Sequence, residues 1–132
     1  MKRIILSRKG FDAKAGGSAS PIFGDGRIFS LPIPQDHPSP KKYKDLNLDG
    51  TSGTQLLKEA SAKVKPTDYC HNDPLLNEDI GIFGQAGSSQ TELKNSSVGP
   101  GDLFLFFGWF KNFSIKGRDL HCLLYTSDAA DE

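Results

Sequence analysis

The chain carries little net charge, few cysteines and no long apolar run. Its 16 basic and 16 acidic residues cancel, but residues 122–132 hold three acids and no base, so the body keeps a mild positive balance. That balance permits an anionic partner without requiring one. The apolar run at Ile4–Leu6 is far too short for a signal core or a membrane span. Cys70 and Cys122 form no framework of paired cysteines, which favours a reducing cytoplasm. The shortness of the apolar run predicts that the protein has no membrane partner.

What is present suits one small domain. The 132 residues include nine Phe, which supply large apolar area for a core. Fourteen Gly and eight Pro indicate much turn and loop. We therefore expect an α+β domain with a mixed or barrel-like β-sheet and two short helices, incomplete at its C-terminus.

The last residues, from Cys122 to Glu132, resemble the translation of a transposase sequencing adapter over their whole length. The alternative is an ordinary strand over residues 120–126 with an acidic end. We interpret residues 1–121 as a truncated domain and residues 122–132 as an artefactual tail. The native protein is then expected to continue past His121.

Apolar patterns and turn residues predict the strands. Residues 3–7 favour a buried first strand, and Gly24-Asp-Gly26 predicts a hairpin that joins residues 22–23 to 27–31. The most apolar run, residues 103–110, predicts a central strand buried on both faces. Shorter strands are expected at residues 80–83 and from Asp119 onward.

Two helices are predicted from spacing and capping. Leu56, Leu57, Ala60 and Val64 share one face of a helix over residues 53–64, which Thr51 or Ser52 can cap. Ser89 and Glu92 have capping-box spacing for a helix over residues 88–95. Residues 74–76 favour a turn or short helix, residues 98–102 a turn, and the proline-rich residues 32–40 and polar residues 41–50 no regular element.

Charged residues gather directly after the first predicted strand. Arg8 offers a planar fork for a phosphate or a base edge, and Lys9 a point charge. Asp12 can accept from an exocyclic amine or take a catalytic proton. The alternative is a solvated loop in which Asp12 bonds its own backbone. Ala15-Gly-Gly-Ser18 allows close approach of an anion, but plain flexibility explains it equally well.

A second polar group is Cys70-His71-Asn72-Asp73. On a strand His71 and Asp73 share a face, so the carboxylate can orient the imidazole for acid–base work. Cys70 would point to the opposite face, and too few further ligands are at hand for zinc, so no metal is expected. The alternative is a turn before Pro74 that Asp73 caps.

Further candidates are more isolated. Gln85 precedes the second predicted helix and can present a donor and an acceptor to a base edge. Trp109 is the aromatic residue best placed to stack on a base, because Gly108 could open space beside it; packing in the core is the alternative. Asp119 and His121 share a face of the last predicted strand, and we expect their native neighbours to be missing.

Four stretches of the chain together resemble a known family. They are Leu6-Ser-Arg-Lys-Gly-Phe-Asp12 with Ala15-Gly-Gly17; Pro21-Ile-Phe with Asp25-Gly-Arg27 and Ser30-Leu-Pro-Ile-Pro34; Cys70-His71-x-Asp73-Pro74 with Phe83-Gly-Gln-Ala-Gly87; and Val98-Gly-Pro-Gly-Asp-Leu-Phe-Leu-Phe-Phe-Gly-Trp-Phe110. The chain resembles the nucleotide-modification-associated domains, the third of that numbered series. The Gly-Asp-Leu-Phe-Leu-Phe-Phe element is also similar to PUA-like folds, including EVE and ASCH domains.

The resemblance implies a component of a bacterial or phage system that modifies DNA bases or nucleotides. Such a component would bind or act on a nucleobase or nucleotide, with Arg8, Lys9, Gln85 and Trp109 as ligand-binding residues and Asp12, His71 and Asp73 as catalytic candidates. The alternative is a non-catalytic PUA-like reader of modified bases in nucleic acid, with DNA favoured over RNA. Whether the domain is an enzyme, and which cofactor it would use, stays open at this point.

Overall fold

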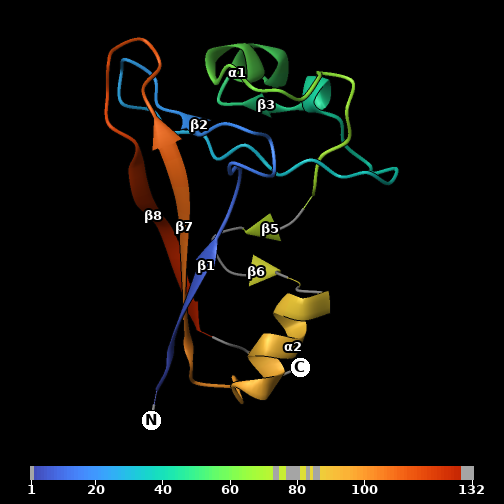
Figure 1. Cartoon of the computed structure of the whole chain (residues 1–132), viewed down its shortest axis with the longest axis vertical. Helices are drawn as coiled ribbons and strands as arrows, with labels where there is room; N and C mark the ends of the chain where they lie inside the picture. Colours follow the sequence, from blue (N-terminus) through green and yellow to red (C-terminus); the bar gives the residue numbers. More distant parts are fainter. Residues whose placement is uncertain (1, 73–74, 77–80, 83, 85–86, 129–132) are drawn as a thin grey trace. The chain divides into compact units, whose positions relative to one another are not determined.

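The computed structural model describes residues 2–72, 75–76, 81–82, 84 and 87–128 (Figure 1). The chain forms two compact units. Unit 1 contains Met1–Ser7, Asp73–Phe107 and Leu123–Glu132, and unit 2 contains Arg8–Asn72 and Gly108–Cys122.

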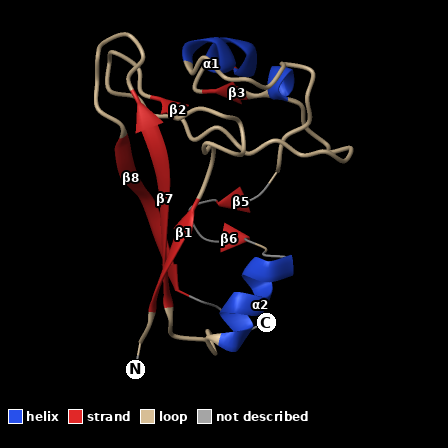
Figure 2. Ribbon diagram, in the orientation of Figure 1, coloured by secondary structure: helices blue, strands red, loops and turns tan. Residues whose placement is uncertain are grey.

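Helices and strands both occur in the described residues, which confirms the α+β class (Figure 2). Parallel pairing joins β2 to β7, whereas β3–β4 and β5–β6 are antiparallel; within the described part no closed barrel forms. The elements are β1 Ile4–Arg8, β2 Ser20–Pro21, the 3-10 helix η1 Tyr43–Asp45, β3 Asn47–Leu48, β4 Thr51–Ser52, α1 Gly53–Glu59, β5 Leu75–Leu76, β6 Gly81–Ile82, α2 Gly87–Asn95, β7 Leu103–Lys111 and β8 Leu120–Asp128.

Strand β1 forms where it was predicted, but the expectation that it is buried is wrong. Ile4 and Leu6 are 64% and 68% exposed, and Ser7 is the buried residue of the strand. The strand lies at the end of the sheet order β1-β7-β2, with one neighbour. An edge strand with a single covered face leaves alternate side chains in solvent.

Strand β7 is central, as predicted, and pairs with β1, β2 and β8. Its burial alternates strictly: Phe104, Phe106, Gly108 and Phe110 are buried, and the residues between them are half-buried. The prediction of burial on both faces is therefore wrong. A continuous apolar run does not reveal that only one of its two faces is fully covered.

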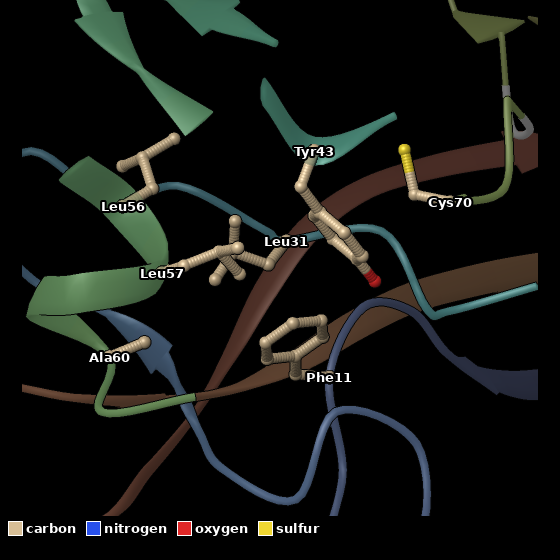
Figure 3. Close-up of a cluster of buried hydrophobic side chains, with 7 residues drawn as sticks. All are labelled: Phe11, Leu31, Tyr43, Leu56, Leu57, Ala60 and Cys70. Atoms are coloured by element: carbon tan, nitrogen blue, oxygen red, sulfur yellow. The ribbon is translucent and has the colours of Figure 1, made fainter. Parts of the chain in front are cut away.

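Unit 2 has its own hydrophobic core. Seven buried side chains form it: Phe11, Leu31, Tyr43, Leu56, Leu57, Ala60 and Cys70. Figure 3 shows Leu31 between the α1 side chains and the Tyr43 ring. Phe11 and Tyr43 meet edge to face with ring centroids 5.9 Å apart, and the Tyr43 hydroxyl donates to the Pro32 carbonyl at 2.7 Å.

Helix α1 supplies one side of this core. The Ser52 hydroxyl accepts from the Gln55 N–H at 3.3 Å, so the predicted cap is confirmed. The helix is shorter than predicted, because Ser61 adopts a left-handed conformation (φ 48) just after the cap residue Ala60. Leu56, Leu57 and Ala60 still face the core as expected.

The predicted turn at residues 24–26 is confirmed, since the Phe23 and Gly26 N–H groups donate to the Arg27 and Phe23 carbonyls. The hairpin strands are reduced to a single bridge between Ile22 and Ile28.

The prediction that residues 41–50 contain no regular element is wrong, because η1 and β3 form there. The cause is local, because the Asp45 carboxylate accepts from the Lys42 N–H while Tyr43 enters the core.

In unit 1, α2 begins at Gly87, so Ser89 lies inside the helix and is not its cap as predicted. Leu75–Leu76 is a strand, not a turn or helix, because it pairs with Gly81–Ile82. That second strand confirms the middle of the prediction for residues 80–83, whose ends lie outside the described residues. The predicted turn at residues 98–102 is confirmed by an Asp102 N–H to Gly99 carbonyl bond.

Strand β8 begins near Asp119 as predicted and continues through Asp128. A strand in residues 122–128 is compatible with an artefactual tail as well as with a native strand. The adapter origin of residues 122–132 therefore stays a prediction.

Candidate functional site

Directly after β1, residues 12–17 form a tight turn that we call the glycine turn. The Asp12 N–H donates to the Ala15 carbonyl at 2.8 Å, and the Gly17 N–H donates to the Asp12 carbonyl at 3.0 Å. Gly16 and Gly17 have φ of 91 and 72, and a Cβ on Gly16 would lie 2.5 Å from the Phe11 ring. The two glycines therefore let the turn close over a core residue.

The Asp12 carboxylate holds this turn together. Its Oδ1 accepts from the N–H groups of Lys14 and Ala15, both at 2.7 Å, and its Oδ2 pairs with Arg8 Nη2 at 3.2 Å. Partial burial raises the pKa of Asp12, but the two backbone N–H groups and the Arg8 charge outweigh it and the net shift is downward. The carboxylate is ionised at neutral pH and fixes the Arg8 side chain.

Residues 8–10 precede the glycine turn and approach two other segments of unit 2, one at Gly108 and one at Leu31. Arg8 keeps a half-exposed side chain, and Lys9 is half-buried. A Cβ on Gly108 of β7 would lie 3.4 Å from the Lys9 carbonyl, and one on Gly10 would lie 2.9 Å from the Leu31 carbonyl. The loop after β1 thus packs against β7.

The second predicted group, at residues 70–73, begins in the core. Burial raises the pKa of the Cys70 thiol, whose Sγ lies 3.7 Å from the Lys41 carbonyl. A protonated, buried thiol is a poor nucleophile. His71 is half-buried, and its N–H donates to the Ile33 carbonyl at 3.0 Å. Asp73 lies outside the described residues, and with it the predicted pairing of His71 and Asp73.

The same core residues and the same chain segment lie beneath both predicted groups, the one at Asp12 and the one at His71. Phe11 and Cys70, which precede Asp12 and His71, belong to one core cluster (Figure 3). Gly10 also lies against the Leu31 carbonyl, and the His71 N–H donates to the Ile33 carbonyl, two residues further along the same segment. The core of unit 2 therefore fixes the glycine turn and the His71 segment relative to each other.

Trp109 lies on the less covered face of β7 and is half-buried. Gly108 does not open the space expected beside it, because β7 continues through Gly108 and the Phe110 ring approaches its Cβ position to 2.6 Å. The alternation of side chains along a strand could have shown this, since Gly108 and Phe110 are two residues apart and share a face of β7.

The remaining candidates are Gln85, Asp119 and His121. Gln85 lies outside the described residues. Asp119 forms an ion pair with Lys111 at 3.4 Å, and His121 is exposed on β8. Among the described residues, no group of three His, Cys, Asp or Glu side chains could hold a metal ion, and no helix is long and apolar enough to cross a membrane.

Sequence reasoning missed two lysines beside the glycine turn. Lys14 lies within it, and Lys63 reaches it from beyond α1: a Cβ on Gly17 would lie 2.8 Å from the Lys63 Cδ. The Lys63 N–H also donates to the Gly16 carbonyl at 3.3 Å. Lys14 could have been suspected from its place next to the glycines, whereas nothing local indicates Lys63.

Comparison with known proteins gives one match. No curated protein and no solved structure matches the chain. Residues 3–127 match the family described as nucleotide modification associated domain 3, which confirms the resemblance inferred from the four sequence stretches. That family is named for an association with nucleotide modification, and the chain belongs to it.

Proposed function

We propose that this domain binds a nucleobase or nucleotide on the surface formed by Arg8, the glycine turn and the His71 segment. Membership of a family named for nucleotide modification supports a ligand of this class. The observation that carries the proposal is the Arg8 guanidinium, half-exposed and held by a carboxylate that the turn itself fixes.

Arg8 suits this ligand chemically. A guanidinium carries five N–H donors in a rigid fork, and Nη2 engages Asp12. The other donors remain for a phosphate or for the O6 and N7 edge of a purine. Because Asp12 restricts the side chain before the ligand arrives, less conformational entropy is lost on binding.

The geometry favours a positioning role for Asp12 over proton transfer. Its lone pairs are engaged by two N–H groups and Arg8, and its pKa is lowered. A general base acting near neutral pH needs a raised carboxylate pKa. Any catalytic role would therefore rest on His71 and Asp73, and binding is the function that the described residues support best.

The direct test is calorimetric titration of the protein with a panel of modified and unmodified mononucleotides. We expect Arg8→Ala to weaken binding by roughly tenfold or more, the value of one well-placed arginine contact. Arg118→Ala removes an exposed arginine elsewhere in unit 2 and should leave affinity unchanged. Asp12→Asn keeps an oxygen for the turn amides but removes the ion pair, so it should weaken binding less than Arg8→Ala does.

Two outcomes would defeat this proposal. The first is the absence of binding across the whole panel by folded wild-type protein. The second is an equal effect of Arg8→Ala and Arg118→Ala, which would make the Arg8 contribution one of general charge.

A reader of modified bases in nucleic acid is the second candidate. It is favoured by the half-buried Trp109 indole on the less covered face of β7, where a base could stack. In that case Trp109→Ala, and not Arg8→Ala, would abolish discrimination between oligonucleotides with and without a modified base.

A further inference from the structure

Three cationic side chains from three chain segments flank the glycine turn. Arg8 comes from the end of β1, Lys14 from the turn itself, and Lys63 from the segment after α1. All three are exposed and belong to unit 2. The sequence separates Lys63 from the other two by about fifty positions, so the fold is what brings it to the turn.

Lys63 is placed there by the missing side chain of Gly17. The Cδ, Cγ and Cε atoms of Lys63 lie 2.8, 3.2 and 3.3 Å from the Cβ position of Gly17. Its aliphatic stem therefore lies across the bare backbone of the turn, with the charged end free to remain in water. The backbone bond from Lys63 N–H to Gly16 fixes the start of the side chain.

The charges at this turn are unbalanced. Asp12 is the acid of the turn, and it is engaged by Arg8 and two backbone N–H groups. Across the part of the chain that the structure describes, neither Lys14 nor Lys63 has a carboxylate within ion-pair distance. The protein as a whole has no formal net charge. A local excess of positive charge beside the glycine turn therefore favours the binding of an anionic partner at this position.

We propose that Lys14 and Lys63 form a phosphate-binding surface for a polynucleotide strand that continues past the nucleotide at Arg8. The proposal rests on the binding function given above and specifies its substrate class: a base presented within a phosphodiester chain, which binds more tightly than a free nucleotide. Arg8 contacts the recognised nucleotide, and the two lysines contact neighbouring phosphates as point charges. Such contacts position the strand and carry no sequence information.

The test compares fluorescein-labelled 12-nucleotide single-stranded DNA, single-stranded RNA and duplex DNA with a mononucleotide, by anisotropy over a range of salt concentrations. For single strands the logarithm of the binding constant falls with the logarithm of salt by roughly 0.7 per phosphate contact. Lys14→Gln/Lys63→Gln should therefore lower that slope by about 1.4. The preferred strand type is read from the three polymer arms.

The matched control is Lys44→Gln/Lys116→Gln, which removes the same charge at two exposed lysines elsewhere in unit 2. We expect its salt slope to equal that of the wild type. Circular dichroism and urea unfolding establish that both double variants are folded, which exposed Lys→Gln changes should allow.

The outcomes separate the two proposals. If mononucleotides bind but the strands bind no tighter, or if both double variants change the slope equally, the phosphate surface is wrong and the nucleotide site stands. If no mononucleotide binds, or if Arg8→Ala and Arg118→Ala weaken binding equally, the nucleotide site fails. The substrate assignment fails with it, whatever the lysines do.

Discussion

The two units differ in how their side chains are buried. Unit 2 encloses seven buried core residues, including the Phe11–Tyr43 pair and the α1 leucines. In the described part of unit 1, α2 buries no residue and β1 leaves Ile4 and Leu6 exposed. The described contacts of unit 1 include the stacked Phe104 and Phe106 rings. They also include the buried Asp102 carboxylate, which accepts from the Arg3 and Gly99 N–H groups.

The candidate site lies on the unit whose described residues enclose a core. Arg8, Lys9, Asp12 and His71 all belong to unit 2, and the residues beside them enter its core. A binding surface needs side chains held by packing beneath them, because loose side chains lose entropy on binding. The following predictions test whether unit 2 is the part whose packing matters.

The largest expected effect is from Phe11→Ala. Phe11 is fully buried, and its ring contacts both Tyr43 and the backbone of Gly16. Removing a buried phenylalanine costs about 3–5 kcal/mol in the free energy of unfolding. The matched control is Leu6→Ala on the exposed face of β1, which should cost under about 0.5 kcal/mol. Urea unfolding measures both, and a similar loss for the two variants would contradict the contrast between the units.

A smaller loss is expected from Gly53→Ala at the start of α1. Its Cβ would lie 1.7 Å from the Tyr43 carbonyl oxygen, so η1 and α1 must move apart. Overpacking of this kind costs about 1–3 kcal/mol. Gly99→Ala in unit 1 is the control, because nothing lies within 4 Å of its Cβ position. Thermal unfolding should show a lower Tm for Gly53→Ala alone, and an unchanged Tm there would mean that this close approach is not maintained in solution.

Local signals predicted much of the fold. The Gly24-Asp-Gly26 turn and the Ser52 cap depend on hydrogen bonds between residues a few positions apart, so the sequence was sufficient to find them. The face of α1 with Leu56, Leu57 and Ala60 followed from helical spacing for the same reason.

What the sequence could not predict depends on neighbours far along the chain. The exposure of Ile4 and Leu6 and the one-sided burial of β7 both follow from which faces of the strands other segments cover. At the site, Asp12 and Arg8 could be paired from their spacing, but the approach of Lys63 to Gly17 required the path of the chain through α1.

The smallest predicted effect is a pH dependence localised at Asp12. Because the pKa of Asp12 is lower in the folded protein than its ordinary value of 3.8, this group contributes stability that is fully present above that value. The contribution is lost as the pH falls below 3.8 through the folded pKa. The carboxylate is partly exposed, so we expect the contribution to be at most about 1 kcal/mol.

Asp12→Asn isolates this contribution, since Asp25 and Asp102 also have lowered pKa values and shape the acid limb of the wild type. The difference in unfolding free energy between wild type and Asp12→Asn should be constant from pH 7 to pH 5 and shrink toward zero below pH 3.8. A difference that persists undiminished at pH 2 would show that the amide side chain disrupts the turn for reasons other than charge. Asp12 would then act mainly through its shape, and the Arg8 ion pair would add little to the rigidity of the site.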